Sequence, residues 1–172
     1  MTDYLEVFMN KPLIVITGAS SGIGAATARL LSSQGHPLLL LARRLEQLEE
    51  LALPNTLCRK VDVTDRGAVE AAVHEAEEQF GPVDAIVNNA GAMLLGRIVD
   101  QPIDEWERMI DLNVKGVLYG VRAVLPGMIA RGGGTILRSV EEVTGPEAGR
   151  GRADHRPWDG PHPIRSTSER EW

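Results

Sequence analysis

The stretch that decides the fold reads Leu13-Ile14-Val15-Ile16-Thr17-Gly18-Ala19-Ser20-Ser21-Gly22-Ile23-Gly24. Its apolar start shows no polar alternation, which predicts a strand buried on both faces of a parallel sheet. The glycines then open a helical pattern that runs to about Gln34. A glycine turn between a buried strand and a helix brings together backbone N–H donors and a partial positive charge, which suits a phosphate group. The alternative interpretation of the glycines alone is a flexible turn.

Apolar runs typical of strands recur along the chain and alternate with helical patterns. The runs cover residues 13–17, 38–41, 56–61, 85–87 and 135–137, and the helical patterns cover residues 23–34, 45–51, 66–80 and 103–131. Alternating strands and helices predict an α/β fold, in which a parallel sheet carries helices on both faces. The glycine turn would then lie at the carboxyl end of the first strand, where ligands of such sheets bind.

The composition narrows the class of protein. With 172 residues and 43% hydrophobic residues, the chain can form one domain with a full core. A formal net charge of -6 argues against a nucleic-acid partner, because nucleic-acid-binding proteins carry a basic face. The single cysteine, Cys58, is expected to be a small core residue. An acidic start and the lack of a long apolar run predict a cytoplasmic protein with no membrane contact.

Three regions are expected along the chain. Residues 1–10 form an N-terminal extension, residues 11–137 form the α/β domain, and residues 138–172 form a divergent tail. From Pro146 onward the tail is rich in Arg, Gly, Pro and His and has no apolar period, which predicts disorder. A second binding module is the alternative for the tail.

Four motifs occur in the order that one known family shows. They are Thr17 to Gly24, Asp62-Val63, Asn88-Asn89-Ala90-Gly91 and Asn113-Val114-Lys115-Gly116. Together they resemble the short-chain dehydrogenase/reductase family over residues 11 to about 136. The resemblance implies a Rossmann-like, doubly wound parallel sheet, here incomplete at about five strands. It also implies hydride transfer between a nicotinamide cofactor and an alcohol or carbonyl, with cofactor contacts from Gly18, Ser20, Ser21, Gly22, Ile23 and Gly24.

The second strand ends in Ala42-Arg43-Arg44, where a NAD-preferring site would place a carboxylate against the ribose. A guanidinium can instead form paired, charge-assisted hydrogen bonds with a 2′-phosphate. The resemblance therefore implies NADP(H) in preference to NAD(H), recognised first by Arg43 and then by Arg44. A solvated charge pair at the start of a surface helix is the alternative.

Asp62 and Val63 follow the third strand. The resemblance implies that Asp62 hydrogen-bonds the adenine amino group and that Val63 flanks the base. The alternative for Asp62 is a cap of the next helix. Thr64 or Asp65 is better placed for that cap, which would leave Asp62 free for the nucleotide.

Two asparagine motifs complete the expected site. The resemblance implies that Asn89, Ala90 and Gly91 line the ribose and nicotinamide, although buried amides need partners and part of their role is structural. Asn113 matches an asparagine that positions water in a proton relay, and an amide bonded to its own helix is the alternative. No metal site is expected.

The family's proton donor is missing from this sequence. The family uses a Tyr-x-x-x-Lys pattern, in which the lysine lowers the pKa of the phenol. Neither Tyr4 nor Tyr119, the two tyrosines, has a lysine four residues later. The family's serine is also out of register: Ser139 fits only with a short deletion, and ungapped counting places Glu141 there.

The residues after the fifth strand suggest how this loss arose. Residues 137–145 look like the end of the helix that follows the family's tyrosine, so serine, tyrosine and lysine would have been deleted together. Possible codons for residues 153–163, read one base later, allow the family's sixth-strand motif Pro-Gly-x-Val-x-Thr. The hypothesis is an internal deletion followed by a frameshift, which the coding DNA would test against a genuine tail.

The leading interpretation is an NADP-dependent oxidoreductase by descent that is inactive as this chain. The alternative is non-catalytic: an NADP(H)-binding module, or a partner that forms homo- or hetero-oligomers through the helix of residues 115–131. A third interpretation is a product with no stable fold, because the sheet would leave a hydrophobic edge. The apolar pocket wall at residues 91–96 does not identify the substrate.

Overall fold

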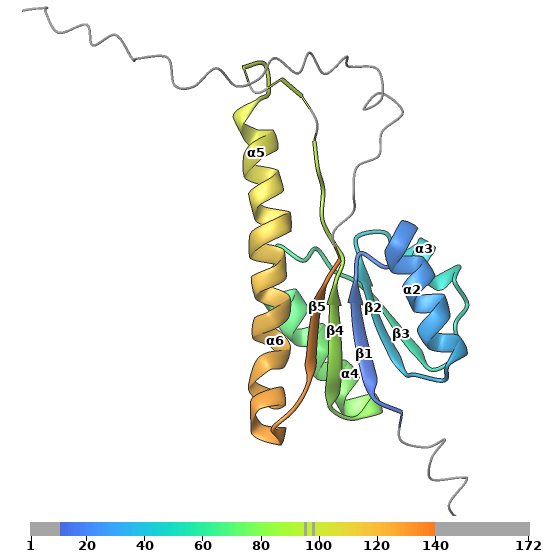
Figure 1. Ribbon diagram of the computed structural model, residues 1–172. Helices are drawn as coiled ribbons and strands as arrows, with labels where there is room; N and C mark the ends of the chain where they lie inside the picture. Colours follow the sequence, from blue (N-terminus) through green and yellow to red (C-terminus); the bar gives the residue numbers. More distant parts are fainter. Residues whose placement is uncertain (1–10, 95, 98, 140–172) are drawn as a thin grey trace, which may run out of the picture. The chain divides into compact units, whose positions relative to one another are not determined.

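The computed structural model describes residues 11–94, 96–97 and 99–139. In this part of the chain, five parallel strands form one sheet in the order β3-β2-β1-β4-β5 (Figure 1). The strands are β1 (Leu13–Thr17), β2 (Leu38–Ala42), β3 (Thr56–Lys60), β4 (Val83–Asn88) and β5 (Thr135–Arg138). The helices are α2 (Gly22–Ser33), α3 (Leu45–Glu49), α4 (Arg66–Phe80), α5 (Ile103–Ile110) and α6 (Gly116–Arg131), and a π-helical segment, η1 (Asp111–Lys115), joins the last two. The predicted alternation is confirmed, and the strand order reverses beside β1, as in a Rossmann-like fold.

The predicted regions at the two ends are described only in part. The extension of residues 1–10 and residues 140–172 of the tail lie outside the described residues. Arg138, which was expected to begin the tail, instead ends β5 and is in register with Asn88 of β4. The strand is therefore longer than its apolar run indicates.

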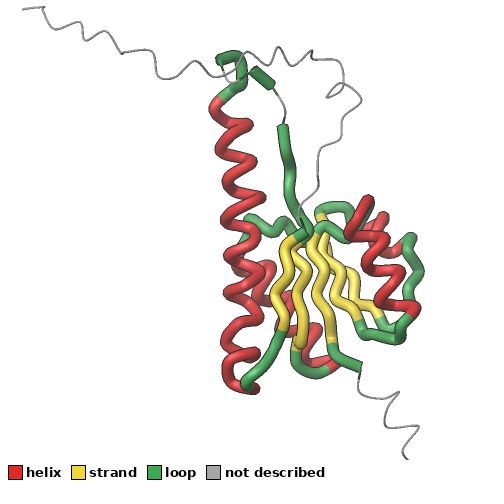
Figure 2. Tube along the Cα trace, viewed as in Figure 1, coloured by secondary structure: helices red, strands yellow, loops and turns green. Residues whose placement is uncertain are grey.

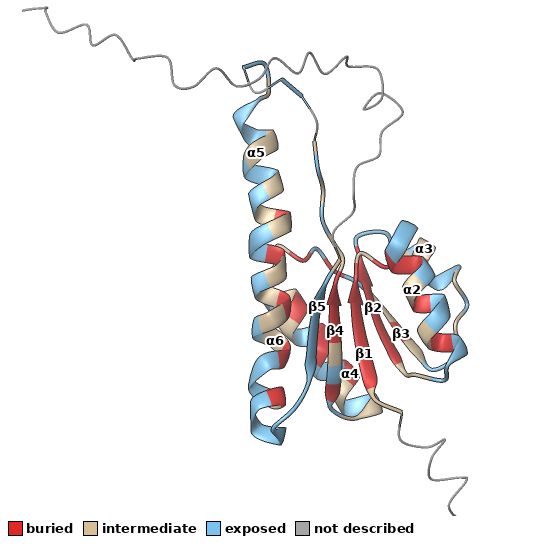
Figure 3. Cartoon of the chain, in the orientation of Figure 1, coloured by how far each residue is buried: buried red, intermediate tan, exposed pale blue. Residues whose placement is uncertain are grey.

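The sheet is buried because its central strands carry apolar side chains on both faces. Every residue of β1 and β2 is buried. One apolar cluster, which includes Val69 and Val124, packs the sheet against α4 and α6. A second cluster, which includes Ala28 and Leu48, packs the other face against α2 and α3. Figure 2 shows helices on both sides of the sheet, and Figure 3 shows the buried residues concentrated in the strands.

The start of α4 and the end of α6 are set by residues with capping roles. The side chain of Asp65 accepts a hydrogen bond from the Ala68 N–H at 3.1 Å, which confirms one of the two predicted caps of α4. Helix α6 ends at Gly132, whose φ of +74° is left-handed. The single helix predicted over residues 103–131 has the right extent, but the wider π-helical turn η1 interrupts it. None of the described helices combines the length and apolar content of a membrane span.

Cys58 differs from its expected place in the core. It lies on β3, an edge strand, and is only half-buried against the cluster under α2 and α3. Burial, with a smaller contribution from the negative charge of Glu49, raises the pKa of its thiol. A strand at the edge of the sheet has a covered inner side and an exposed outer side, which explains the partial burial.

Candidate cofactor site

The turn between β1 and α2 has the geometry of an anion-binding loop. Gly18 and Gly22 have φ values of +66° and +54°, which residues with a Cβ rarely adopt. Ser21 precedes the helix without a side-chain capping bond, and the first turn of α2 holds no acidic residue. Ile23, in the same turn, is 45% exposed. A Cβ at Gly22 would meet no atom within 4 Å, so there is open space beside this helix end. The first backbone N–H groups of a helix have no intrahelical partner, and they favour an anion.

Two glycines allow the loop to lie close to the residues that follow β4. A Cβ at Gly18 would lie 2.8 Å from Ala90 Cα, and a Cβ at Gly24 would lie 2.5 Å from Asn89 Nδ2. That amide nitrogen donates to the carbonyl oxygens of Thr17 and Gly18, each at 3.1 Å. The glycines therefore permit a backbone approach that a larger residue would block.

Thr17 is a structural residue of the site that sequence reasoning did not single out. Its Oγ1 accepts hydrogen bonds from the backbone N–H groups of Asn89 and Ala90, each at 3.0 Å, and donates to the Val87 carbonyl at 3.5 Å. The residue is 2% exposed. The sequence does contain a signal for this network, since Thr17 places a single hydroxyl at the end of an otherwise apolar strand. A buried hydroxyl requires hydrogen-bond partners.

The Asn89 side chain, whose Nδ2 donates to the Thr17 and Gly18 carbonyls, forms one further hydrogen bond. Its Oδ1 accepts a hydrogen bond from Ser139 Oγ at 2.8 Å, and the Ser139 N–H donates to the Asn88 carbonyl at 3.2 Å. Ser139, one of two candidates for the family's serine, is thus bonded to β4. Glu141, the other position considered, lies outside the described residues.

Asn113 lies in η1 and is bonded to the loop after β4. Its Oδ1 accepts from the Ala92 N–H at 3.0 Å, and its Nδ2 donates to the Ala92 carbonyl at 2.7 Å. A Cβ at Gly91 would lie 2.7 Å from Asn113 Oδ1, so glycine permits this approach. The alternative in which the amide bonds its own helix is not what the structure shows.

A second group of residues surrounds a cleft of about 260 Å³ near the ends of β2 and β3. Arg43 and Asp62 form one part of its wall, and residues of α5 and η1 form the other. The lining residues are Arg43, Asp62, Thr64, Asp104, Glu107, Arg108, Asp111 and Leu112. The contribution of α5 was not predicted, although its polar residues recur at a spacing of three to four, which places them on one helix face.

Asp65, and not Asp62, caps α4, and the Asp62 side chain forms a turn with Thr64. Its Oδ1 accepts hydrogen bonds from Thr64 N–H at 3.0 Å and Thr64 Oγ1 at 2.8 Å. Burial raises the pKa of this carboxyl, but the two bonds and the charges of Arg43 and Arg108 together hold it below its ordinary value. Val63, the next residue, is 5% exposed and does not line the cleft.

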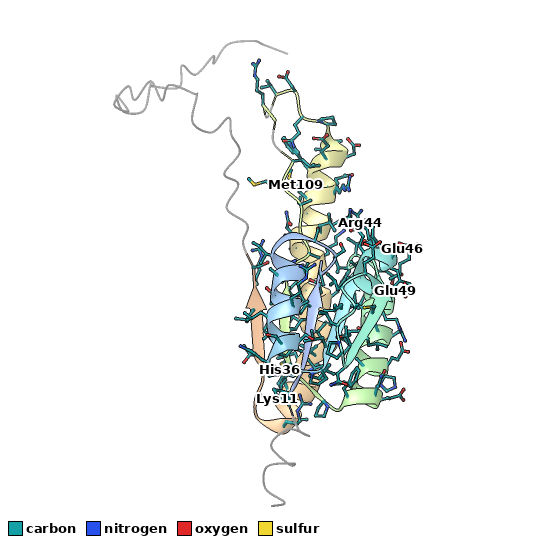
Figure 4. The ribbon with its side chains drawn as sticks, turned by 90° about the vertical axis from the view of Figure 1, so that its right-hand side faces the viewer. Lys11, His36, Arg44, Glu46, Glu49 and Met109 are labelled. Atoms are coloured by element: carbon teal, nitrogen blue, oxygen red, sulfur yellow. The ribbon has the colours of Figure 1, made fainter. Side chains whose placement is uncertain are left out.

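Arg43 and Arg44 reach different parts of the site. Arg43 lines the cleft, whereas Arg44 Nη2 donates to Ser20 Oγ in the glycine loop at 3.4 Å. Figure 4 shows Arg44 at the end of the sheet opposite Lys11 and His36. One guanidinium therefore lies at the cleft and the other at the loop.

Comparison with known proteins places the chain in a family. Residues 12–146 match the family model described as short chain dehydrogenase. The chain is 46% identical over 135 residues to an uncharacterized oxidoreductase from Listeria monocytogenes, a match that covers 75% of this chain and 54% of that protein. It is 45% identical over 136 residues to glycine betaine reductase ATRR from Emericella nidulans, covering 75% of this chain and 11% of that protein. The chain thus spans about half the length of its Listeria relative.

Solved structures show the same fold. Serine dehydrogenase from Escherichia coli superposes with a TM-score of 0.69 at 36% identity, covering 73% of this chain and 60% of that chain. A closed form of serine dehydrogenase complexed with NADP+ superposes with a TM-score of 0.70 at 36% identity, covering 73% of this chain and 52% of that chain. Because the family model covers most of the sequence and the described residues share this fold, the chain belongs to the short-chain dehydrogenase family.

Proposed function

We propose that this chain is the cofactor-binding half of a short-chain dehydrogenase and that it binds NADP(H). The observation that carries the proposal is the turn of residues 18–22, which combines two glycines of positive φ with a helix start free of acidic side chains. A pyrophosphate suits this turn, because backbone N–H groups and the helix dipole both favour an anion. Asp62 at the cleft would accept a hydrogen bond from the adenine amino group.

The preference for NADP(H) over NAD(H) rests on the cations after β2. Arg43 lines the cleft and Arg44 contacts Ser20, so both would lie near the adenosine ribose if the nucleotide occupies the loop and the cleft. No carboxylate stands at the end of β2 to bind a free 2′-hydroxyl. The related serine dehydrogenase that was solved with NADP+ supports the same choice.

The chemistry would be hydride transfer between NADP(H) and an alcohol or carbonyl, with the hydride supplied or accepted by the nicotinamide when the cofactor is bound. Asn89, Ala90 and Gly91 would line the ribose and nicotinamide. Asn113 would act as a positioning residue, since it holds Ala92 beside them and could order water for proton transfer. This sequence has no Tyr-x-x-x-Lys to move the proton, so we propose cofactor binding without turnover.

Calorimetric titration of the purified chain with NADPH and with NADH tests the proposal. We expect tighter binding of NADPH, and a loss of about tenfold in that preference in Arg43→Leu, because a charge-assisted pair to phosphate is removed. Arg29→Leu removes an exposed arginine of α2 and is the matched control. Equal affinity for the two cofactors would contradict the preference, and no binding by a folded chain would contradict the cofactor role.

A non-catalytic partner role is the second candidate, through the helix of residues 115–131. Helix α6 exposes Leu118, Leu125 and Ile129 at 59%, 38% and 70% of their surfaces. Exposed apolar side chains grouped on one element favour contact with another protein. Light scattering on the chain alone and mixed with an intact relative tests this role, and a monomer in both samples would contradict it. The cytoplasmic location and the lack of a nucleic-acid partner stay predictions.

A further inference from the structure

The α5 wall of the cleft carries an arginine, Arg108, to which the proposed cofactor contacts give no role. Arg108 is exposed, and among the described residues its guanidinium has no ion-pair partner. Asp111, in the next turn of the chain, pairs instead with Lys115 at 2.6 Å. The planar, charged end of Arg108 is therefore available to a ligand in the cleft.

The α5 wall is poorly suited to a phosphate. Asp104 and Glu107 line the cleft beside Arg108, and both are exposed carboxylates. Negative charges at short range repel a phosphate dianion. Arg43, in contrast, follows a strand that holds no acidic residue. A 2′-phosphate is therefore expected at Arg43, and Arg108 should meet an uncharged part of the nucleotide.

Two other residues of the cleft indicate which part this is. Leu112, at 9% exposure, adds an apolar side chain to the wall that carries Arg108. Asp62, the proposed acceptor for the adenine amino group, has its pKa lowered in part by the charge of Arg108, so the guanidinium lies near this carboxylate. A flat base suits this set of groups, because arginine stacks on the π-face of a base.

We infer that Arg108 contacts the adenine ring from the α5 side of the cleft and strengthens binding of NADP(H) and NAD(H) alike. The inference rests on the proposed cofactor function and adds a contact from α5 to it. The two arginines then have separate roles: Arg43 binds the 2′-phosphate that only NADP(H) carries, and Arg108 binds the base that both cofactors carry. A guanidinium suits the second role because it is planar and less strongly hydrated than an ammonium.

Calorimetric titration of the purified full chain with NADPH, NADH and AMP tests these roles. AMP carries the base but lacks both the 2′-phosphate and the nicotinamide. Arg108→Leu should weaken binding of all three ligands by the same factor, about threefold to tenfold, because a contact between a cation and an aromatic ring is removed. The ratio of NADPH affinity to NADH affinity should stay that of the wild type. Arg43→Leu should lower this ratio and leave NADH affinity unchanged.

Two control variants show whether the plane of the guanidinium matters. Arg108→Lys keeps the charge and loses the plane, so it should recover only part of the affinity that Arg108→Leu loses. Arg29→Leu removes the same charge from an exposed position of α2 outside the cleft, and it should bind all three ligands as the wild type does. Because both arginines are exposed, we expect the variants to fold, and far-UV circular dichroism checks this.

Three results would overturn the inference. Wild-type affinities in Arg108→Leu would show that the contact does not form. A loss confined to NADPH would assign Arg108 to the 2′-phosphate, and full recovery in Arg108→Lys would replace stacking by charge alone.

The proposed cofactor function fails by a different result, which is a folded wild-type chain that binds neither NADPH nor NADH. AMP then still reports on Arg108. AMP binding that weakens in Arg108→Leu would retain the contact with adenine, and an absence of AMP binding would overturn that contact as well.

Discussion

The side-chain amide of Asn113 and the backbone of Ala92 form a reciprocal pair, with Oδ1 accepting at 3.0 Å and Nδ2 donating at 2.7 Å. This pair joins η1 to the loop that follows β4. Because each amide atom meets the complementary backbone group, only an amide satisfies both. The pair therefore fixes the loop of residues 89–92, which the proposed cofactor would contact.

Asn113→Asp should lower the free energy of unfolding by about 1–3 kcal/mol, because an oxygen replaces the nitrogen that faces the Ala92 carbonyl. Urea denaturation monitored by tryptophan fluorescence measures the change. Gln34→Glu, the same chemical change at an exposed position after α2, is the control. A similar loss in both variants would show that added negative charge, not the lost pair, is responsible.

Gly24→Ala should lower the free energy of unfolding by about 1–3 kcal/mol and weaken NADPH binding, because the new Cβ would overlap its neighbours. The Cβ would lie 2.5 Å from both Asn89 Nδ2 and the Gly18 carbonyl. Gly67→Ala is the matched control, since its nearest neighbour would be Asp65 Oδ1 at 3.5 Å. That variant should gain up to about 1 kcal/mol from helix propensity. Unimpaired stability in Gly24→Ala would contradict the close approach.

Asp62 should make stability depend on pH in the acid range. Its pKa in the folded chain is lowered, so the folded state binds the proton less readily than the unfolded state. The stabilisation is therefore complete above the ordinary aspartate pKa of about 3.9 and is lost as pH falls below it. Unfolding free energies of wild type and Asp62→Asn should differ at neutral pH and converge in acid. Asp84→Asn, at an exposed position of β4, is the control. Parallel pH curves for wild type and Asp62→Asn would contradict a lowered pKa of Asp62 in the folded chain.

Asn88 and Gly120 should be energetically coupled. Asn88 is 3% exposed, and neither polar atom of its side chain has a hydrogen-bond partner among the described residues. A Cβ at Gly120 would collide with its Oδ1. Gly120→Ala should therefore cost about 1–3 kcal/mol in the wild-type background and less in Asn88→Ala, where the amide is gone. Thermal or urea unfolding of the four proteins measures the coupling, and purely additive changes would contradict the contact.

Much of the architecture follows from local patterns. The unbroken apolar runs at β1 and β2 predict buried central strands, and both are wholly buried. The glycines of the first turn predict an unusual backbone, and Gly18 and Gly22 have positive φ. The sequence predicts these features because the burial of a central strand and a left-handed backbone depend mainly on the residue types at those positions.

Other features arise only when distant residues meet. Periodicity alone predicts one helix over residues 103–131, since η1 differs from an α-helix only in its hydrogen-bond spacing. The polar stripe of α5 gives no sign that it forms a wall of the cleft with Arg43 and Asp62. The sequence pattern also gives no sign of the turn in which Thr64 donates two hydrogen bonds to Asp62 Oδ1.

By itself, the sequence determined the alternating α/β order, the glycine turn at the end of β1 and the family to which the chain belongs, because these depend on residue type and spacing along the chain. Only the tertiary structure decided the Thr17 network, the pairing of Asn113 with Ala92 and the open edge at β5. Thr17 and Asn89 are 72 residues apart in sequence, so their contact depends on the register of β1 against β4. Hydrogen-bond partners and edge exposure are properties of packed strands, and a linear pattern does not contain them.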